Sequence, residues 1–133
     1  MLTIRKEQED LFREAASQRF IQRASEHLKK SFGPQCKVLG DGKLRAFIRL
    51  GVQRADRWDV TTSRNVCIYL DVMMTLGIDF DRDPRLPWIR RILGSQSATE
   101  TVRIDRLYQA VMRMLEQISS SGPSRDGRRA DGD

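Results

Sequence analysis

The sequence predicts an all-α protein, folded as a single compact domain of about five helices around a central apolar helix. Apolar residues recur at intervals of three and four over several long stretches, and this spacing places them on one face of an α-helix. The nine glycines and four prolines gather mostly at a few breaks between these stretches, where such residues end one helix and begin the next. Helices joined by short breaks therefore account for most of the chain.

The length and composition are those of one globular domain with a heavily charged surface. The chain has 133 residues, of which 39% are hydrophobic and 32% are charged, enough for one hydrophobic core but not for two. We expect the helical domain to span residues 1–119. Residues 120–133 are small, polar and charged, with the sequence SSGPSRDGRRADGD, so we expect a disordered polar tail there.

Two long helices are predicted in the first half of the chain. The first covers residues 5–31 and is stopped by Gly33, which we expect to cap its end. The second covers residues 41–57 and starts at Asp41, a good N-cap residue. Gly51 lies on its apolar face, and because a mid-helix glycine costs about 1 kcal/mol relative to alanine, we expect another helix to approach closely there.

The third predicted helix is the central one. It starts at Thr62 or Ser63, ends at Leu76 before Gly77, and carries Asp71 as the only charged residue of its interior. A helix that is apolar on nearly every side is surrounded by the rest of the fold. Its apolar residues are Val66, Cys67, Ile68, Tyr69, Leu70, Val72, Met73, Met74 and Leu76.

Two further helices complete the predicted fold. Leu86-Pro87-Trp88 opens a short helix that runs to Leu93, since proline suits the first helical turn. A fifth helix is predicted over residues 99–119. Its apolar face consists of Ile104, Leu107, Tyr108, Val111, Leu115 and Ile118.

The sequence also predicts a cytoplasmic protein. The opening residues MLTIRKEQED contain no apolar signal-peptide core, and no run of about 18 apolar residues is present to span a membrane. In the cytoplasm Cys36 and Cys67 are expected to stay reduced, and with a single histidine they do not form a zinc site. We therefore expect no cofactor and no membrane partner.

Three alternating aspartates follow the central helix and resemble the start of an EF-hand calcium loop. They are Asp79, Asp81 and Asp83. The match fails because Pro84 stands where that loop needs glycine, and Arg90 stands where a glutamate would close the site. We expect these aspartates to cap loop amides and the N-terminus of the next helix instead.

No pattern typical of a catalytic site appears elsewhere. His27 lies near the end of the first helix with no obvious nucleophile beside it, so we expect it to be packed or to face the helix dipole. Aspartates interleaved with arginines do not predict the two differently placed carboxyl groups of a hydrolase. The chain is expected not to be an enzyme.

The net charge of +6 permits nucleic acid, an anionic membrane or an acidic protein as a partner. Residues 41–57, the turn after them and the opening TTSRN of the next helix superficially match a helix-turn-helix. A recognition helix needs a polar exposed face, whereas this helix is apolar beyond Asn65. Because the basic residues alternate with acidic ones, we do not expect nucleic acid to be the partner.

The segment after the central helix carries the candidate partner-binding residues. Aromatic residues and arginine are enriched at the energetic centres of protein interfaces. The candidates are Phe80, Arg82, Asp83, Arg85, Leu86 and Trp88. The alternative is structural, with Phe80 and Trp88 closing the base of the core.

Three stretches together resemble a known family. They are the opening MLTIRKEQ, the segment TTSRNVCIYLDVMMTLG and the loop DFDRDPRLPW. Over residues 1–118 the chain is similar to small bacterial proteins encoded in type VI secretion effector clusters, beside VgrG or PAAR spike genes and adaptor chaperones. The resemblance implies a cytoplasmic, non-enzymatic co-chaperone that binds the adaptor chaperone, the toxic effector or both, and helps load the effector onto the spike.

Two functions of other classes stay open, as does self-association. An immunity protein would bind and inhibit a cognate toxin, and this basic chain would then need an acidic toxin surface. A small DNA-binding regulator would show binding that weakens steeply with salt. The family's shared loop is either a docking surface or only a folding signature.

Overall fold

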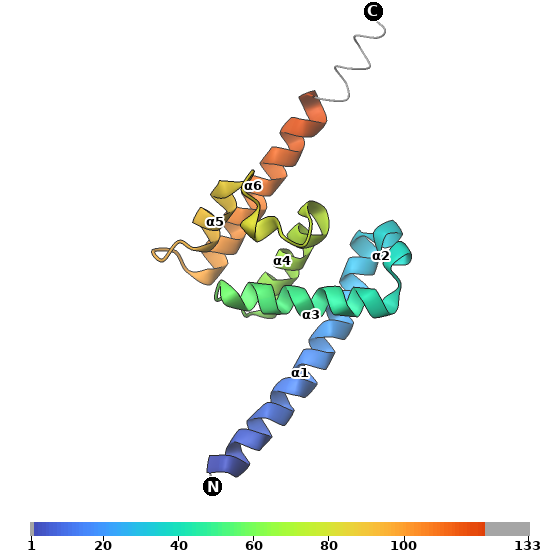
Figure 1. The fold of residues 1–133 in the computed structure, drawn as a ribbon, viewed down its shortest axis with the longest axis vertical. Coiled ribbons are helices and arrows are strands. Elements are labelled where there is room, and N and C mark those ends of the chain that lie inside the picture. The colour runs from blue at the N-terminus through green and yellow to red at the C-terminus, as the bar shows by residue number, and fades with distance from the viewer. Residues whose placement is uncertain (1, 122–133) are drawn as a thin grey trace, which may run out of the picture. The chain divides into compact units, whose positions relative to one another are not determined.

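The computed structural model describes the backbone of residues 2–121 and the side chains of residues 17–119 (Figure 1). Over this range it contains six α-helices, one short 3-10 helix and no strand. The predicted all-α class is confirmed, with six α-helices where about five were expected. The chain divides into two compact units, Met1–Ile78 and Asp79–Asp133, which we call unit 1 and unit 2 and describe one at a time.

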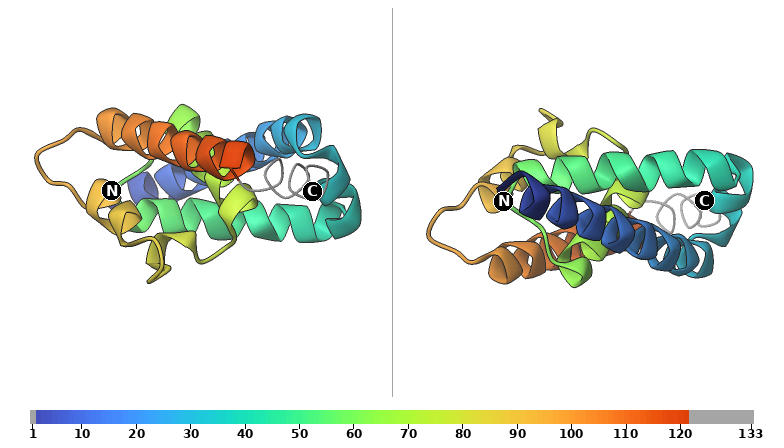
Figure 2. Two further views of the ribbon diagram at one scale, coloured as in Figure 1. Left: turned by 90° about the horizontal axis from the view of Figure 1, so that it is seen from above. Right: turned by 90° about the horizontal axis from the view of Figure 1, so that it is seen from below.

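Unit 1 consists of four helices, and the three longest ones match the predictions closely. They are α1 (Leu2–Ser31), α3 (Asp41–Arg57) and α4 (Ser63–Leu76). α1 passes across α3, and the short helix α2 (Gly33–Leu39) joins the two at one end (Figures 1 and 2). α4 packs against both α1 and α3.

Helix α2 stands where a helix cap was predicted. Gly33 was expected to cap the end of α1 but instead begins α2. Among the described glycines, a positive φ occurs at Gly40 (83°) and Gly77 (110°) and not at Gly33. The prediction failed because proline is also well suited to the first turn of a helix, where its missing N–H would have no partner. Pro34 therefore opens a new helix, and this helix brings Cys36 into a buried position.

The N-cap of α3 also differs from the prediction. Gly40 occupies that position, and Asp41 is the first helical residue. The Asp41 carboxylate lies 3.0 Å from Nζ of Lys29 on α1, and this contact lowers the pKa of Asp41 below its ordinary value. Both side chains are well exposed, so the pair contributes little to stability.

Helix α4 is closely surrounded, as its apolar sequence predicts. The N–H of Asn65 donates to Thr62 Oγ1 at 3.4 Å, which caps the start of the helix at the predicted place. Gly77 ends it with a positive φ, a conformation in which glycine carries no steric penalty. The buried apolar residues of α4 are Val66, Tyr69, Leu70, Val72 and Met73.

A glycine allows α3 and α4 to approach each other closely. Gly51 is buried on α3, and a Cβ atom placed there would overlap Leu70 Cδ2 and lie 3.4 Å from Met73 Sδ. Only a residue without a side chain leaves Leu70 in its present position. The predicted packing reason for Gly51 is confirmed.

A polar contact joins α1 to α4. His27 Nε2 lies 2.8 Å from Asp71 Oδ1, so His27 contacts a carboxylate on another helix and is not the packed or dipole-facing residue that was predicted. Burial raises the pKa of Asp71, and the hydrogen bond with His27 acts in the opposite direction without cancelling this effect. The one charged residue inside α4 is thus partnered but still partly desolvated.

Unit 2 contains the 3-10 helix η1 (Phe80–Arg82), α5 (Pro87–Leu93) and α6 (Glu100–Ser121). α5 packs on α6. The guanidinium of Arg103, which is only 7% exposed, donates to the carbonyl oxygen of Leu93 at 2.7 Å and so satisfies a carbonyl group at the end of α5. The buried apolar residues of the two helices are Ile89, Leu93, Ile104, Leu107 and Val111.

The last predicted helix, over residues 99–119, is confirmed as α6 and continues to Ser121. The tail predicted over residues 120–133 therefore overlaps the end of α6, and residues 122–133 lie outside the described part of the chain. Within the described residues, no helix combines the length and the apolar character needed to cross a bilayer.

Gly51→Ala is expected to destabilise the protein by about 1–3 kcal/mol, the usual cost of overpacking a core. The matched control is Gly42→Ala in the same helix, where a Cβ atom would meet nothing within 4 Å. This control is expected to stabilise the protein by about 0.5–1 kcal/mol, because alanine favours helix more than glycine does. Urea unfolding measures both changes, and equal effects of the two alanines would contradict the close contact.

Asp71→Asn is expected to be at least as stable as the wild type at pH 7. Because the folded-state pKa of Asp71 is raised above 3.8, its contribution to stability is full below that pH and is lost as pH rises through the folded-state pKa. Asparagine keeps an oxygen that can contact His27 and does not ionise. The stability of Asp71→Asn relative to the wild type, measured by thermal unfolding, should therefore increase from pH 4 to pH 7. A deficit above about 1 kcal/mol at pH 7, the size of one hydrogen bond, would refute this expectation.

Candidate functional site

The predicted interface lies in the segment that includes η1 and the start of α5, and we call residues 79–88 the arginine loop. Its backbone is held by successive turns. The N–H of Arg82 donates to the carbonyl of Asp79 at 3.0 Å, and the N–H of Leu86 donates to the carbonyl of Asp83 at 3.0 Å. The loop is therefore an ordered support from which side chains project.

Phe80 is not part of the exposed surface of the arginine loop. It is only 1% exposed, so it belongs to the core and the prediction that it contacts a partner is wrong. Phe80 is the first residue of η1, and removal of its large apolar ring from water is favourable. The structural alternative stated for Phe80 holds instead.

Asp83 and Arg85 form the most specific arrangement in the loop. Asp83 Oδ1 accepts hydrogen bonds from the backbone N–H of Arg85 at 2.9 Å and from its Nε at 3.1 Å, while Oδ2 accepts from Nη2 at 2.9 Å. These contacts lower the pKa of Asp83 and raise the pKa of Arg85. The Asp83 side chain is 15% exposed and that of Arg85 is 86% exposed, so the carboxylate holds the guanidinium in place at the surface.

The expected role of the aspartates is confirmed in part. Asp83 caps a loop amide, as predicted, whereas the N-cap residue of α5 is Leu86, whose side chain makes no capping hydrogen bond. Asp81 is buried, and its carboxylate lies 4.0 Å from Nε of Arg82. Within the described residues no group of three His, Cys, Asp or Glu side chains is placed to hold a metal ion.

The exposed side chains of this region are mainly basic. Arg82 is about half exposed, Leu86 and Trp88 are half-buried, and Arg85 stands well clear of the surface. Arg90 and Arg91 on α5 are exposed too and have no ion-pair partner among the described residues. Arg90 and Arg91 were not among the predicted site residues. The sequence did contain a signal for them, because Ile89 and Leu93 are spaced four residues apart and are buried, and this spacing places Arg90 and Arg91 on the exposed side of the helix.

The two cysteines are free thiols. Cys36 is buried and Cys67 is half-buried. Burial is the main cause that raises the pKa of both thiols, and Asp71 adds to the effect at Cys67. Both therefore favour the protonated form, which is a poor nucleophile.

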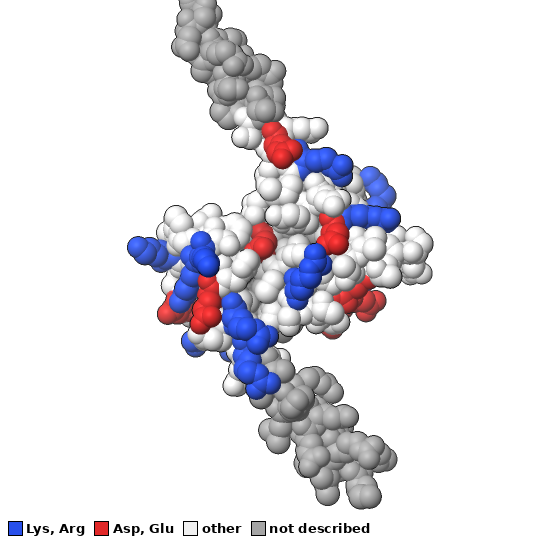
Figure 3. Space-filling model, turned by 180° about the vertical axis from the view of Figure 1, so that it is seen from behind, with Lys and Arg blue, Asp and Glu red and all other residues white. Residues whose placement is uncertain are grey.

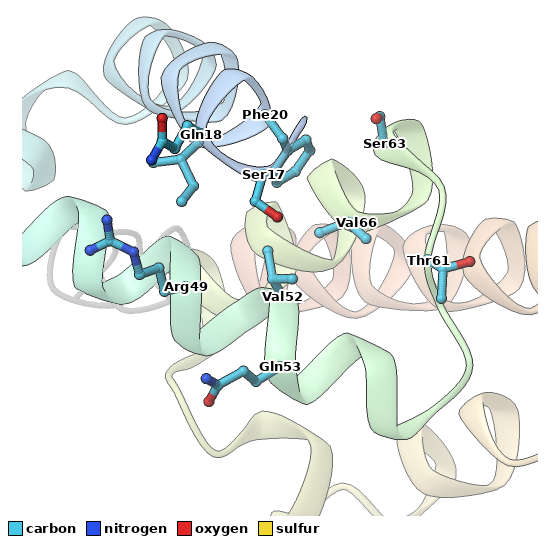
Figure 4. Close-up of a pocket in the computed structure, with 10 residues that line it drawn as sticks. Ser17, Gln18, Phe20, Arg49, Val52, Gln53, Thr61, Ser63 and Val66 are labelled. Atoms are coloured by element: carbon cyan, nitrogen blue, oxygen red, sulfur yellow. The ribbon is translucent and has the colours of Figure 1, made fainter. Parts of the chain in front are cut away.

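A groove in unit 1 was not expected from the sequence. It lies between α1, α3 and the start of α4, and has a volume of about 460 Å³. In Figure 4, Ser17 and Phe20 of α1 point toward the same space as Val52 of α3 and Val66 of α4. Its lining comes from three separated segments, so no local sequence pattern reveals it.

Elsewhere the charges are mixed. On the face shown in Figure 3, Lys and Arg side chains are scattered among Asp and Glu. Nucleic-acid-binding surfaces usually carry a continuous basic patch or stripe.

No protein-family model, curated protein or solved structure matches this chain.

Phe80→Ala is expected to destabilise the protein by about 3–5 kcal/mol, the usual cost of removing a buried phenylalanine ring. The neighbouring Arg82→Ala is the control, because truncation of an exposed side chain usually changes stability by less than about 0.5 kcal/mol. Chemical denaturation followed by circular dichroism measures both. A Phe80→Ala protein as stable as the Arg82→Ala protein would show that the ring does not contribute to the core.

Proposed function

We propose that this protein is a non-enzymatic co-chaperone, which binds an adaptor chaperone or its toxic effector for loading onto the type VI secretion spike. The observation that carries the proposal is the bond between Asp83 and Arg85. It presents an arginine that is 86% exposed in a defined orientation. The resemblance of the loop sequence to proteins of type VI effector clusters supplies the biological setting.

An arginine held in this way is well suited to bind a protein surface. A free arginine loses rotamer freedom when it binds, at a cost of about 0.5–1.5 kcal/mol. The contact with Asp83 removes part of that cost before the partner arrives. The guanidinium retains donors that do not face Asp83, and these suit a carboxylate or a carbonyl oxygen of the partner.

The surroundings of Arg85 favour an acidic partner surface. Arg82, Arg90 and Arg91 add positive charge within a short stretch of chain, and the half-buried Trp88 adds apolar area. Arginine with tryptophan is a combination enriched at the centres of protein interfaces. Complementary charge would also speed encounter with an acidic partner and make binding weaker at high salt.

The test is affinity capture of the tagged protein from its native host, with copurifying proteins identified by mass spectrometry. We expect the wild type to recover an adaptor chaperone together with an effector. Arg85→Glu should reduce this recovery at least tenfold, because it reverses the charge that the loop presents. Arg57→Glu, an exposed arginine on α3 of unit 1, is the matched control and should recover as much as the wild type.

Three results would count against the proposal. Equal recovery by Arg85→Glu and Arg57→Glu would show that the arginine loop is not the interface. Recovery of a toxin alone, with a stoichiometric loss of its activity, would assign the protein to the immunity class. Retention of duplex DNA at low salt, with no adaptor or effector recovered, would favour a DNA-binding regulator.

A further inference from the structure

The groove in unit 1 is a second surface with the features of a binding site, and it is formed independently of the arginine loop. α1 and α3 cross each other, and α4 begins only at Ser63 (Figures 1 and 4). The groove lies between these two long helices, near the start of α4. Its volume of about 460 Å³ lies within the range of about 300–1,000 Å³ that is usual for ligand sites.

The floor of the groove is apolar. Phe20, Ile21 and Val52 are half-buried, and Val66 is only 4% exposed. Each of the first three would lose further contact with water if apolar groups of a partner filled the space. Burial of apolar area is favourable, so the floor provides the affinity of such a contact.

The rim of the groove is polar and carries one charge. Hydroxyl and amide side chains surround the floor, and Arg49 is the only charged residue among the described residues that line the groove. Arg49 is exposed and has no ion-pair partner among the described residues. Its guanidinium places a positive charge at the rim, which favours an acidic group that enters beside the floor.

The wider charge of unit 1 has the same sign. Lys and Arg outnumber Asp and Glu between residues 17 and 78. Two of these acidic residues are already engaged, since Asp41 contacts Lys29 and Asp71 contacts His27. A partner with acidic flanks would be attracted to this unit, and one with basic flanks would be repelled.

We infer that this groove binds an amphipathic helix of a partner protein, with acidic residues flanking its apolar stripe. The apolar stripe lies on Phe20, Ile21 and Val52, and an acidic flank reaches Arg49. Recognition of this kind uses anchors spaced at i, i+3 or i+4, and i+7 on the bound helix. The inference does not depend on a role in type VI secretion.

The probe for the test is a display library of helical peptides with a fixed leucine stripe. The flanking positions are randomised among Glu, Lys and Gln, and the library is selected on the full-length protein. We expect Glu to be enriched at the flanks. A selected peptide should bind at least tenfold more weakly to Arg49→Glu and to Val52→Glu, while the control Arg57→Glu should bind it as the wild type does.

A charge exchange makes the result specific to Arg49. The same peptide with Lys at its flanks should bind Arg49→Glu more tightly than it binds the wild type. Thermal unfolding by circular dichroism checks that each variant is folded. Because Arg49 is exposed, its substitution tests the groove even if Val52→Glu lowers stability.

The following results would overturn the inference. They are enrichment of Lys or Gln at the flanks, failure to enrich any peptide, and selected peptides that bind all three variants equally. Sedimentation could instead show a dimer that Val52→Glu dissociates, and the groove would then be covered by a second copy of this chain. An Arg85→Glu protein that no longer captures the effector but binds the selected peptide as the wild type does would instead support the groove as a site distinct from the arginine loop.

Discussion

The close approach of α3 and α4 at Gly51 is the constraint on which the rest of unit 1 depends. Leu70 occupies the space that any side chain at position 51 would need. Protein interiors are packed as densely as organic crystals, so an added methyl group has to displace its neighbours. The position of α4 against α3 in turn places Val66 at the floor of the groove and Asp71 opposite His27.

The two candidate surfaces differ in how they would hold a partner. The arginine loop presents charge and direction, because Asp83 fixes the guanidinium of Arg85 through two side-chain bonds of 3.1 Å and 2.9 Å. The groove presents apolar area, with Arg49 at its rim. A charged group with a fixed orientation favours fast and selective encounter with a partner. Apolar area that becomes buried favours a long-lived complex. The co-chaperone role proposed above would use both properties, the first to meet a partner and the second to retain it.

The burial of Phe80 shows why residue type alone is a poor guide to an interface. Aromatic residues are enriched both in cores and in the centres of interfaces, so the loop sequence could not assign Phe80 to one or the other. The structure decides this, because the ring is 1% exposed while the nearby guanidinium of Arg85 projects into solvent. The acidic side chains that surround the arginines are likewise not equivalent, since Asp81 is buried and Asp83 is bonded to Arg85.

The sequence by itself determined the class of the fold and the course of its long helices. The apolar spacing placed α3 and α4 within a residue of their observed bounds, and Gly51 on an apolar face already indicated a close helix contact. These features depend on neighbours along the chain, which a sequence shows directly. Only the tertiary structure decided that Gly33 begins a helix, that His27 meets Asp71, that Phe80 is buried, and that three helices enclose a groove. Each of these depends on contacts or competing turn geometries that residue spacing does not specify, because several arrangements satisfy the same local preferences.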